Sequence, residues 1–205
     1  NGDFAEIGSD LVTNGDFSAA GINLVSNPNF TDLPLGADWT LGTGWSIGDS
    51  KAISTLQSGS KYLTQSSVVE SGKSYKVSFE VIDYTSGSVK ATVSGDEGEA
   101  RTAIGTYTEI LNATGTSFSI KNQSGLFIGS VSNISVQELG EGWTVGSGWT
   151  FGDDVAICDG SGANDLLYQI SLPSGDDKSF KVTFTISSYT SGNVYPLFLV
   201  DGSSI

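Results

Sequence analysis

The chain has 205 residues, of which 38% are apolar and 10% aromatic, so it can bury a packed core and is not expected to be disordered. Its 23 acidic and 9 basic residues give a net charge of −14, which repels nucleic acid and anionic membrane surfaces. There is no histidine and a single cysteine, Cys158, which excludes histidine-dependent triads, His-ligated zinc and an intrachain disulfide. We expect neither nucleic-acid binding nor membrane insertion, because no apolar run approaches the length of a membrane helix.

A short phrase occurs three times near the N-terminal end of the sequence. The first opening phrase is "NGDF" at Asn1–Phe4, the second is "LVTNGDF" at Leu11–Phe17, and the third is "LVSNPNF" at Leu24–Phe30. Because Asn-Gly and Asn-Pro are turn dipeptides, each phrase is predicted to form a short apolar strand followed by a turn. We assign the three phrases, with the Pro- and Gly-containing stretch after them, to an N-terminal segment at residues 1–37.

A longer repeat follows the opening phrases. The stretch "WTLGTGWSIGD" at Trp39–Asp49 returns as "WTVGSGWTFGD" at Trp143–Asp153. Further along, "SYKVSFEVIDYTSGSV" at Ser74–Val89 matches "SFKVTFTISSYTSGNV" at Ser179–Val194. Because the match covers several separate stretches in the same order, a whole domain is repeated and not only one site.

The two copies of this domain differ in extent. We place the first copy, a β-sandwich, at residues 38–140 and the second at residues 141–205. After the "YTSG" stretch the first copy continues through Lys90–Leu139, whereas the second has only Tyr195–Ile205. We therefore expect the second copy to be incomplete at its C-terminal end, and the sequence to be a piece of a longer tandem array.

The second copy has no opening phrase directly before it, because Glu138–Gly142 runs straight into Trp143. A sandwich without its first strand exposes unpaired backbone groups, which can pair with another segment. We predict that Asn1–Phe4 or Leu11–Phe17 packs against a domain other than residues 38–139, in the same chain or in a neighbouring subunit. The alternative is that the surplus phrases are remnants of earlier repeats and lie as ordered linkers.

Alternation of apolar and polar residues predicts strands in both copies. The alternating stretches are Tyr75–Val81, Val89–Val93, Phe118–Ile120, Ile134–Val136 and Phe180–Ile186. In the first of them, Tyr75, Val77 and Phe79 are expected to face inward. The Thr-Ser-Gly tripeptides at 85–87 and 190–192 are predicted to be turns between successive strands. Short alternating strands without amphipathic helices predict an all-β fold of tandem antiparallel β-sandwich (jelly-roll) domains.

The order of these phrases resembles a known family. The "LVxNxxF" phrases, the "GW" phrases, the "GKSYKVSFEV" stretch and the closing "GSVSNISVQEL" at Gly129–Leu139 are similar to carbohydrate-binding modules of the galactose-binding-like jelly-roll type. Tandem versions with "GTGW" and "YTSGSV" are similar to repeats of bacteriophage virion proteins, especially tail fibres and surface-attached decoration proteins. The resemblance implies that an opening phrase lies beside the closing strand. It implies a sugar ligand less directly, because the fold also serves as pure architecture.

Aromatic residues supply the candidates for carbohydrate binding, because their rings can stack on sugar rings. We select Trp39 and Trp143 from the repeated tryptophan stretch, and Tyr84 and Tyr189, which follow alternating strands and would lie at the rim of a sandwich. The alternative for the tryptophans is a place in the core, since they alternate with other apolar residues. Either role, sugar contact or a place in the core, stays open for three further tyrosines, Tyr62, Tyr107 and Tyr168.

The resemblance also implies a structural calcium position where an opening phrase meets the closing strand. Its oxygen ligands would come from Asn14 and Asp16, or from Asn27 and Asn29, together with Asn133. Calcium is the one cofactor that we consider. The acidic residues stand in no recognisable glycosidase arrangement, and we expect the protein not to be an enzyme.

These observations lead to two hypotheses for the function. The first is a phage virion structural protein, a fibre or decoration component at the virion surface, that displays carbohydrate-binding-like modules for adsorption to host surface polysaccharide. Its partners would be other virion proteins, further copies of itself in a homo-oligomer such as a trimer, and a host glycan. The alternative is the non-catalytic carbohydrate-binding region of a secreted bacterial glycoside hydrolase or adhesin. A third reading, architecture without any ligand, is also open.

Overall fold

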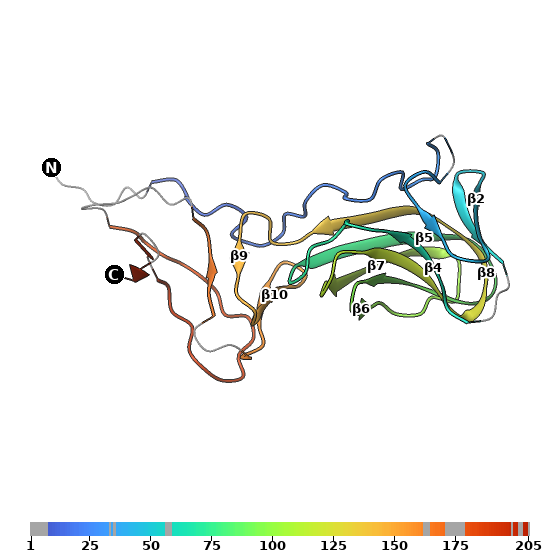
Figure 1. Cartoon of the computed structure of the whole chain (residues 1–205). Helices are drawn as coiled ribbons and strands as arrows, with labels where there is room; N and C mark the ends of the chain where they lie inside the picture. The colour runs from blue at the N-terminus through green and yellow to red at the C-terminus, as the bar shows by residue number, and fades with distance from the viewer. Residues whose placement is uncertain are drawn as a thin grey trace.

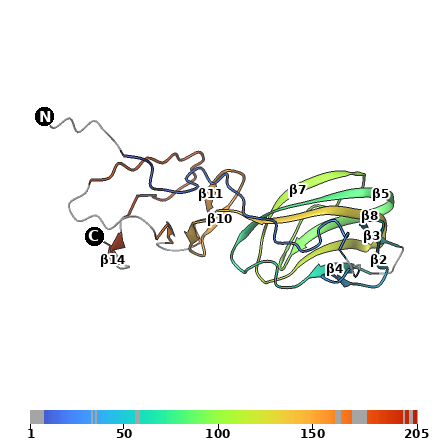
Figure 2. The same ribbon diagram turned by 90° about the horizontal axis from the view of Figure 1, so that it is seen from above.

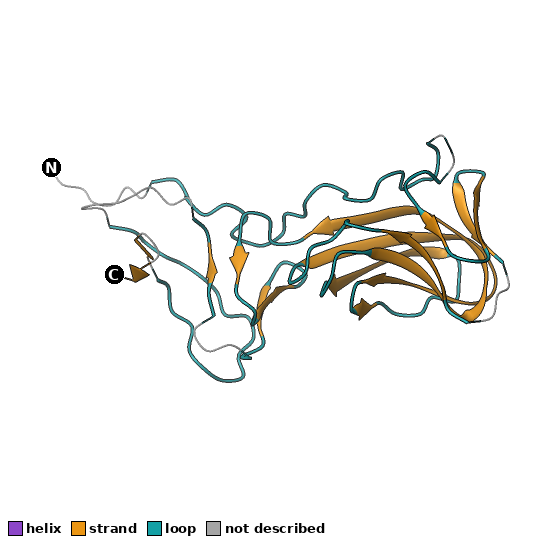
Figure 3. Ribbon diagram, viewed as in Figure 1, coloured by secondary structure: helices purple, strands orange, loops and turns teal. Residues whose placement is uncertain are grey.

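The computed structural model of the chain describes residues 8–32, 34, 36–55, 59–161, 165–170, 179–197, 199–200 and 203–204. All regular secondary structure in this part of the chain is β-strand (Figure 3), and the strands pair antiparallel, which confirms the predicted fold class. The strands are β1 (Thr40–Leu41), β2 (Trp45–Gly48), β3 (Lys51–Ser54), β4 (Lys61–Gln65), β5 (Ser74–Val93), β6 (Asp96–Glu97), β7 (Gly105–Asn112), β8 (Phe118–Glu138), β9 (Thr144–Val145), β10 (Trp149–Phe151), β11 (Ala156–Cys158), β12 (Leu167–Tyr168), β13 (Leu199–Val200) and β14 (Ser203–Ser204). No described part of the chain forms a helix that could cross a membrane.

Two long strands, β5 and β8, organise the sandwich of the first copy (Figure 1). They pair along their length, from Tyr75 opposite Glu138 to Val93 opposite Phe118. One half of this ladder extends through β7 on one side and through β3 and β2 on the other. The other half extends through β6 and through β4 and β1. The two layers are therefore one eight-stranded sheet folded over a common core.

The Thr-Ser-Gly stretch at 85–87 does not form the predicted turn, because β5 continues through it. Gly87 has a φ of 78°, and the register with β8 shifts on both sides of Ser86. Shifts of this kind are β-bulges, which bend a strand without ending it. Both flanks of the stretch pair with the same partner strand, so the chain bends here and does not reverse.

The inner faces of the two layers form the core of the first copy. Tyr75, Val77 and Phe79 are all buried, which confirms the predicted facing of this part of β5. The other alternating stretches of the first copy also point apolar side chains inward, namely Val89, Ala91, Val93, Phe118, Ile120, Ile134 and Val136. Burying one such large apolar side chain contributes about 1.5–3 kcal/mol, so this core accounts for most of the cohesion of the sandwich.

The third opening phrase lies beside the closing part of β8, as the resemblance implies. Leu24 donates its N–H to the carbonyl of Val136 at 2.9 Å, and Ile134 donates its N–H to the carbonyl of Pro28 at 3.2 Å. The side chain of Asn23 adds bonds to the backbone of both β8 residues. The apolar part of the phrase is nevertheless not the strand that we predicted, because single backbone bonds and the Asn23 amide replace a regular ladder.

The second and third opening phrases have the same turn. Asn14 and Asn27 have φ values of 49° and 46°, and Phe17 and Phe30 have φ values of 59° and 56°. In each phrase the Phe N–H donates to the Asn carbonyl at 3.2 Å. Asparagine tolerates this left-handed backbone better than most residues, which explains its place at the start of the turn. The predicted turn is confirmed in both phrases, whereas the strand predicted at Leu11–Val12 is not formed.

The start of the second copy repeats the strand pairing of the first. β9 pairs with β12 as β1 pairs with β4, and β10 pairs with β11 as β2 pairs with β3. Trp149 lies opposite Cys158, just as Trp45 lies opposite Ser54. These short strands lie at one end of the sandwich (Figure 2), where the N–H of Phe151 donates to the side-chain oxygen of Ser74 at 3.0 Å.

The stretch Ser179–Val194 differs from its counterpart in β5. Alternation predicts a strand at Phe180–Ile186, but this prediction is wrong: no strand is formed between residues 179 and 197, and the side chains there are exposed. In the first copy the segment with the same pattern, in β5, pairs with β7 on one side and with β8 on the other. The described strands of the second copy include no equivalent of either neighbour, so this stretch lacks the strand partners that hold β5 in place.

The second opening phrase packs against the second copy of the same chain. The indole N–H of Trp143 donates to the carbonyl of Asn14 at 2.9 Å, and the ring of Phe17 lies 5.3 Å from that of Trp143. The prediction that a surplus phrase contacts a domain other than residues 38–139 is therefore confirmed, within one chain. The first opening phrase lies outside the described residues.

The first copy is consequently inserted between the opening phrase and the body of the second copy. Its two ends lie side by side, because Ala20 and Leu139 form a β-bridge and Gly21 donates its N–H to the carbonyl of Glu138 at 2.8 Å. Adjacent ends are what allow one domain to be inserted into another without disturbing it. Figure 1 shows the N-terminal segment passing the second copy before it reaches the sandwich.

Candidate functional site

An exposed tyrosine lies in a polar row on the outer surface of the sandwich. Tyr62 of β4 faces away from the core because its neighbour Leu63 faces inward, and it is 42% exposed. The strand register places it opposite Lys121 of β8, which in turn lies opposite Lys90 of β5. We name this surface the Tyr62 face, and it consists of Tyr62, Thr64, Lys90, Glu97, Ser119 and Lys121.

Glu97 of β6 holds both lysines of the Tyr62 face. One carboxylate oxygen lies 2.6 Å from the Lys121 ammonium, and the other lies 2.6 Å from the Lys90 ammonium. Hydrogen bonds from Lys121 and then Lys90 lower the pKa of Glu97, and the bond to Glu97 raises the pKa of Lys121. Both shifts favour the charged forms of Glu97 and Lys121, and the stems of the two lysines lie against the sheet.

Lys121 also orients the ring of Tyr62. Its Nζ lies 5.7 Å from the ring centroid, within the range of a cation–π interaction. Beside the ring, the hydroxyls of Thr64 and Ser119 are hydrogen-bonded at 2.8 Å. The site thus presents a partly exposed aromatic ring on a rigid sheet, next to ammonium, carboxylate and hydroxyl groups. A ring of this kind can stack on a sugar, while the polar groups exchange hydrogen bonds with sugar hydroxyls.

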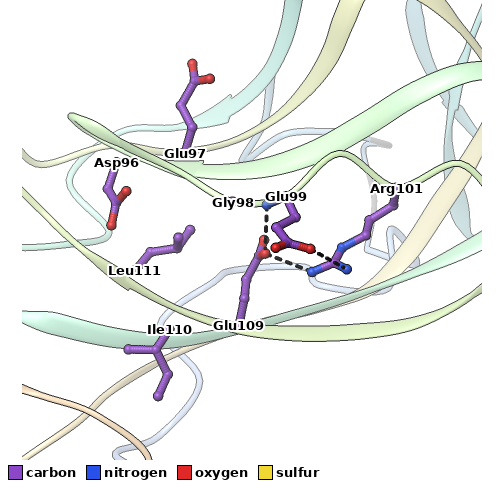
Figure 4. Close-up of a pocket in the computed structure, with 8 residues that line it drawn as sticks. All are labelled: Asp96, Glu97, Gly98, Glu99, Arg101, Glu109, Ile110 and Leu111. Atoms are coloured by element: carbon purple, nitrogen blue, oxygen red, sulfur yellow. Dashed lines mark hydrogen bonds and ion pairs between the residues drawn. The ribbon is translucent and has the colours of Figure 1, made fainter.

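A groove adjoins the Tyr62 face at Glu97, where β6 faces β7 (Figure 4). It encloses about 470 Å³, a volume in the range of small-molecule sites. Its lining residues are Asp96, Glu97, Gly98, Glu99, Arg101, Glu109, Ile110 and Leu111.

Several charged groups of this groove make bonds that join the strands on its two sides, although Arg101 Nε and Glu109 Oε1 are buried without a hydrogen-bond partner among the described residues. One carboxylate oxygen of Glu109 accepts from the guanidinium of Arg101 at 3.1 Å and from the N–H of Glu99 at 3.0 Å. Asp96 accepts the N–H of Asn112 in β7 at 2.9 Å. These bonds tie β6 and the segment after it to β7, so we interpret the groove as a structural seam beside the Tyr62 face.

A smaller groove of about 260 Å³ crosses the outer face of the other layer. There Asp83 accepts from Lys51 at 2.8 Å and from Ser130 at 2.6 Å, and these bonds, first that of Lys51, lower its pKa. None of the described residues that line this groove is aromatic. Asp83 and Thr85 line it, but Tyr84 between them faces the opposite side of the strand.

The two tyrosines selected for carbohydrate binding have the same local role in the two copies. Tyr84 donates its hydroxyl to the carbonyl of Gly87 at 3.1 Å, and Tyr189 donates to that of Gly192 at 3.0 Å. Tyr84 packs against the core, with its ring 6.4 Å from that of Phe127. Tyr189 is 68% exposed. Sugar binding by either remains a prediction, and only Tyr189 has a ring open to a ligand.

The two selected tryptophans are used to hold opening phrases. Trp39 is 5% exposed, and its ring lies 5.3 Å from that of Phe30 and 6.3 Å from that of Phe118. Trp143 is half-buried and lies against Phe17. The position of Trp39 fits the core alternative and its burial counts against a sugar contact, whereas Trp143 lies outside the core; a sugar contact remains a prediction for both.

Of the residues selected for calcium, Asn14 and Asp16 lie apart from Asn133, whereas Pro28, between the alternative ligands Asn27 and Asn29, accepts the N–H of Ile134 next to Asn133. Asn14 and Asp16 accept backbone N–H groups within their own turn, and the Asn14 amide donates to the carbonyl of Glu141 in the second copy. Asn133 lies at a β-bulge of β8 with a φ of 52°, and its amide donates to Glu80. Among the described residues, no group of three or more His, Cys, Asp or Glu could hold a metal ion. Calcium binding remains a prediction.

The sequence leaves the role of Tyr62 open and does not reveal its partners. The alternation of polar and apolar residues around Lys90 and Lys121 shows that both face outward. That Tyr62 lies beside Lys121 and Glu97 depends on the pairing of β8 with β4 and with β5, strands that are distant in the sequence, and of β5 with β6. Only the fold brings these residues together.

Comparisons with known proteins add the following. No family model and no curated protein matches the chain. One solved structure, described as "CBM4 structure and function", is similar with 14% identity and a TM-score of 0.34, over 62% of this chain and 98% of that chain. Another, described as "BiXyn10A CBM1 APO", has 18% identity and a TM-score of 0.33, over 59% of this chain and 86% of that chain. At these TM-scores the likeness carries no argument about function.

Proposed function

We propose that this chain belongs to a bacteriophage virion surface protein, a fibre or decoration component, whose first copy binds host surface polysaccharide through the Tyr62 face. In this proposal the protein lies on the outside of the virion, contacts other virion proteins and assembles as a homo-oligomer, a trimer. The resemblance of its tandem phrases to virion repeats supports this setting. The insertion of one copy into the other supports a rigid, projecting array.

The observation that carries the binding part is the ring of Tyr62 beside a fixed charge network. An aromatic ring at a surface is common, but here Lys121 holds the ring and Glu97 holds Lys121. The site therefore needs little ordering when a ligand binds, which favours affinity from a small contact area. Its hydroxyls and charged groups suit a polyhydroxylated ligand better than an apolar one.

One observation favours the alternative, the accessory binding region of a secreted glycoside hydrolase or adhesin. The position of Tyr62 is occupied in the second copy by Leu166, since both backbone carbonyls accept a glycine N–H at 2.8 Å in the same strand pair. The ring is thus not repeated with the domain. One such site per chain is enough for an accessory binding region, whereas a fibre would reach multivalent binding only by assembling several subunits.

Glycan-array binding by the whole chain tests the proposal, with Tyr62→Ala as the decisive variant. We expect binding to at least one bacterial surface polysaccharide, and a loss of at least about tenfold in affinity with Tyr62→Ala. Leu166→Ala is the matched control, because it removes the side chain at the equivalent position of the second copy. Tyr84→Ala tests the tyrosine that lies against the core.

Two outcomes of this experiment contradict the binding proposal. One is no binding to any bacterial surface polysaccharide, which leaves the protein as architecture. The other is binding that Tyr62→Ala leaves unchanged while Leu166→Ala or Tyr84→Ala weakens it. Detection of the protein on purified virions with a specific antibody separates the virion setting from the secreted alternative.

A further inference from the structure

The second opening phrase is held as a peptide is held in a binding site. Gln169 accepts the N–H of Thr13 at 3.1 Å and donates its amide to the Thr13 carbonyl at 2.6 Å. Trp143 donates its indole N–H to the carbonyl of Asn14. The ring of Phe17 lies 5.3 Å from that of Trp143 and 5.7 Å from that of Phe151. We call Trp143, Phe151 and Gln169 the phrase-binding site.

The first copy contains an equivalent site with a different phrase in it. Gln65 makes the same two bonds to Ser26, at 3.1 Å and 2.6 Å. Trp39 donates its indole N–H to the carbonyl of Asn27 at 3.3 Å and lies 5.3 Å from the ring of Phe30. One set of contacts thus accepts two phrases, "TNGDF" and "SNPNF". They share only the asparagine, the phenylalanine and their spacing.

These contacts define what the site recognises. The Gln and Trp side chains bond to backbone groups, so they select a backbone shape and not particular side chains. That shape requires a left-handed residue at Asn14, which favours asparagine, and the site then requires an aromatic ring at Phe17. The site is not selective at the two positions between them, because Gly15 and Asp16 in one phrase correspond to Pro28 and Asn29 in the other.

The attachment of the second phrase is open to solvent. Leu11 and Val12 are exposed, and the bonds between Thr13 and Gln169 lie at the surface. In the first copy, by contrast, Phe30 and Gln65 are buried. A segment held at a surface by a few side chains, outside any β-ladder, can leave and return while the rest of the fold persists.

We propose that the phrase-binding site is a peptide-recognition site for Asn-x-x-Phe phrases, and that it accepts the second opening phrase of another copy of this chain when its own phrase is released. Within one chain, the covalent link gives the phrase an effective concentration on the order of millimolar, which favours internal docking. Exchange between two chains preserves every contact and joins the chains, as in domain swapping.

A peptide tests the site, and the full chain carrying Phe17→Ala is the receptor because its own phrase is weakened. The probe is a fluorescein-labelled peptide of residues 9–21, "SDLVTNGDFSAAG". We expect saturable binding in fluorescence anisotropy, and at least about tenfold weaker binding when the peptide carries Phe17→Ala or the receptor also carries Trp143→Leu. The matched control peptide has "NPNF" in place of "NGDF" and should bind nearly as well. If Phe17→Ala unfolds the second copy, Asn14→Ala replaces it.

A mixture of two full-length variants tests exchange between chains. Trp143→Leu leaves an intact phrase beside a damaged site, whereas Phe17→Ala leaves an intact site beside a damaged phrase. In sedimentation velocity, the mixture should contain a larger species that neither variant forms alone, and added peptide should dissociate that species into monomers. Absence of that species at about 1 mM total protein, or peptide binding that Trp143→Leu leaves unchanged, overturns the proposal.

Discussion

Strand β5 of the first copy and the stretch Ser179–Val194 of the second have almost the same alternation of residues, yet they differ completely in structure. Phe79 is 0% exposed in β5, whereas Phe184, at the equivalent position, is 50% exposed. β5 pairs with β7 on one side and with β8 on the other, and the second stretch pairs with no described strand. Alternation therefore shows which side of a strand would be buried, but neighbouring strands decide whether the strand exists.

The largest effect should come from the two equivalent phenylalanines. Phe79→Ala removes a fully buried ring that packs 5.8 Å from Tyr107, and should cost about 3–5 kcal/mol of unfolding free energy. Phe184→Ala should change it by less than about 0.5 kcal/mol, because the side chain is half exposed. Urea unfolding followed by tryptophan fluorescence measures both.

Equal losses from the two substitutions would contradict this comparison. Such a result would mean that Phe184 is buried in solution by strands that the described structure does not contain. Hydrogen exchange separates the cases, since the amides of 180–186 should exchange far faster than those of 75–81.

The two sites that hold opening phrases give the next effect. Gln65→Ala should cost about 1–3 kcal/mol, because Gln65 is buried and the partly buried backbone groups of Ser26 lose both of their bonds to it. Gln169→Ala should cost less, about 0.5–1.5 kcal/mol, because water can replace the bonds that it loses at Thr13. Amide exchange at Ser26 and Thr13 reports each site separately. A larger loss at Gln169 than at Gln65 would contradict the solvent-exposed attachment.

Part of this architecture can be read from the sequence. The alternation around Val77 predicts its inward facing, and the missing phrase before Trp143 predicts docking by Asn1–Phe4 or Leu11–Phe17, of which the structure shows the second. The bend at Thr-Ser-Gly 85–87 could not be predicted, because it depends on both flanks pairing with one long strand. The Tyr62 face could not be predicted for the same reason. Its residues are brought together by the register between strands and are not neighbours in the chain.

The charge networks predict how the first copy responds to pH. Bonds to lysines lower the pKa of Glu97 and of Asp83 in the folded state. A lowered pKa means that their stabilisation is present above the unfolded pKa, about 4, and is lost as the pH falls through the folded value. The pKa values of Lys121 and Lys51 are raised in the folded state, so these lysines contribute stability up to alkaline pH. That stabilisation is lost only as the pH rises above about 10.5.

Stability measured against pH checks this expectation. Between pH 5 and about 2, the urea midpoint should fall less steeply in Glu97→Gln than in the unmodified protein, and Asp83→Asn should reduce the fall in the same way. The effect should be smaller than those of the buried substitutions, since both carboxylates are about half exposed to solvent. Glu141→Gln, at an exposed position between the copies, is the control, and an equal flattening by this variant would contradict the role of the lysine bonds.

The smallest effect concerns the residue after the asparagine in each opening phrase. Gly15 and Pro28 occupy the same position of one turn, since Asn14 and Asn27 have nearly equal φ values and the same hydrogen bond closes both turns. Gly15→Pro should therefore fit without strain and stabilise the docked phrase by about 0.4–1 kcal/mol, because proline restricts the unfolded chain more than glycine does. Pro28→Gly should destabilise the first copy by a similar amount for the same reason. Differential scanning calorimetry of both variants measures the two changes, which should be opposite in sign. A clear destabilisation by Gly15→Pro would show that the two turns differ, and that the two phrases are not held in the same way.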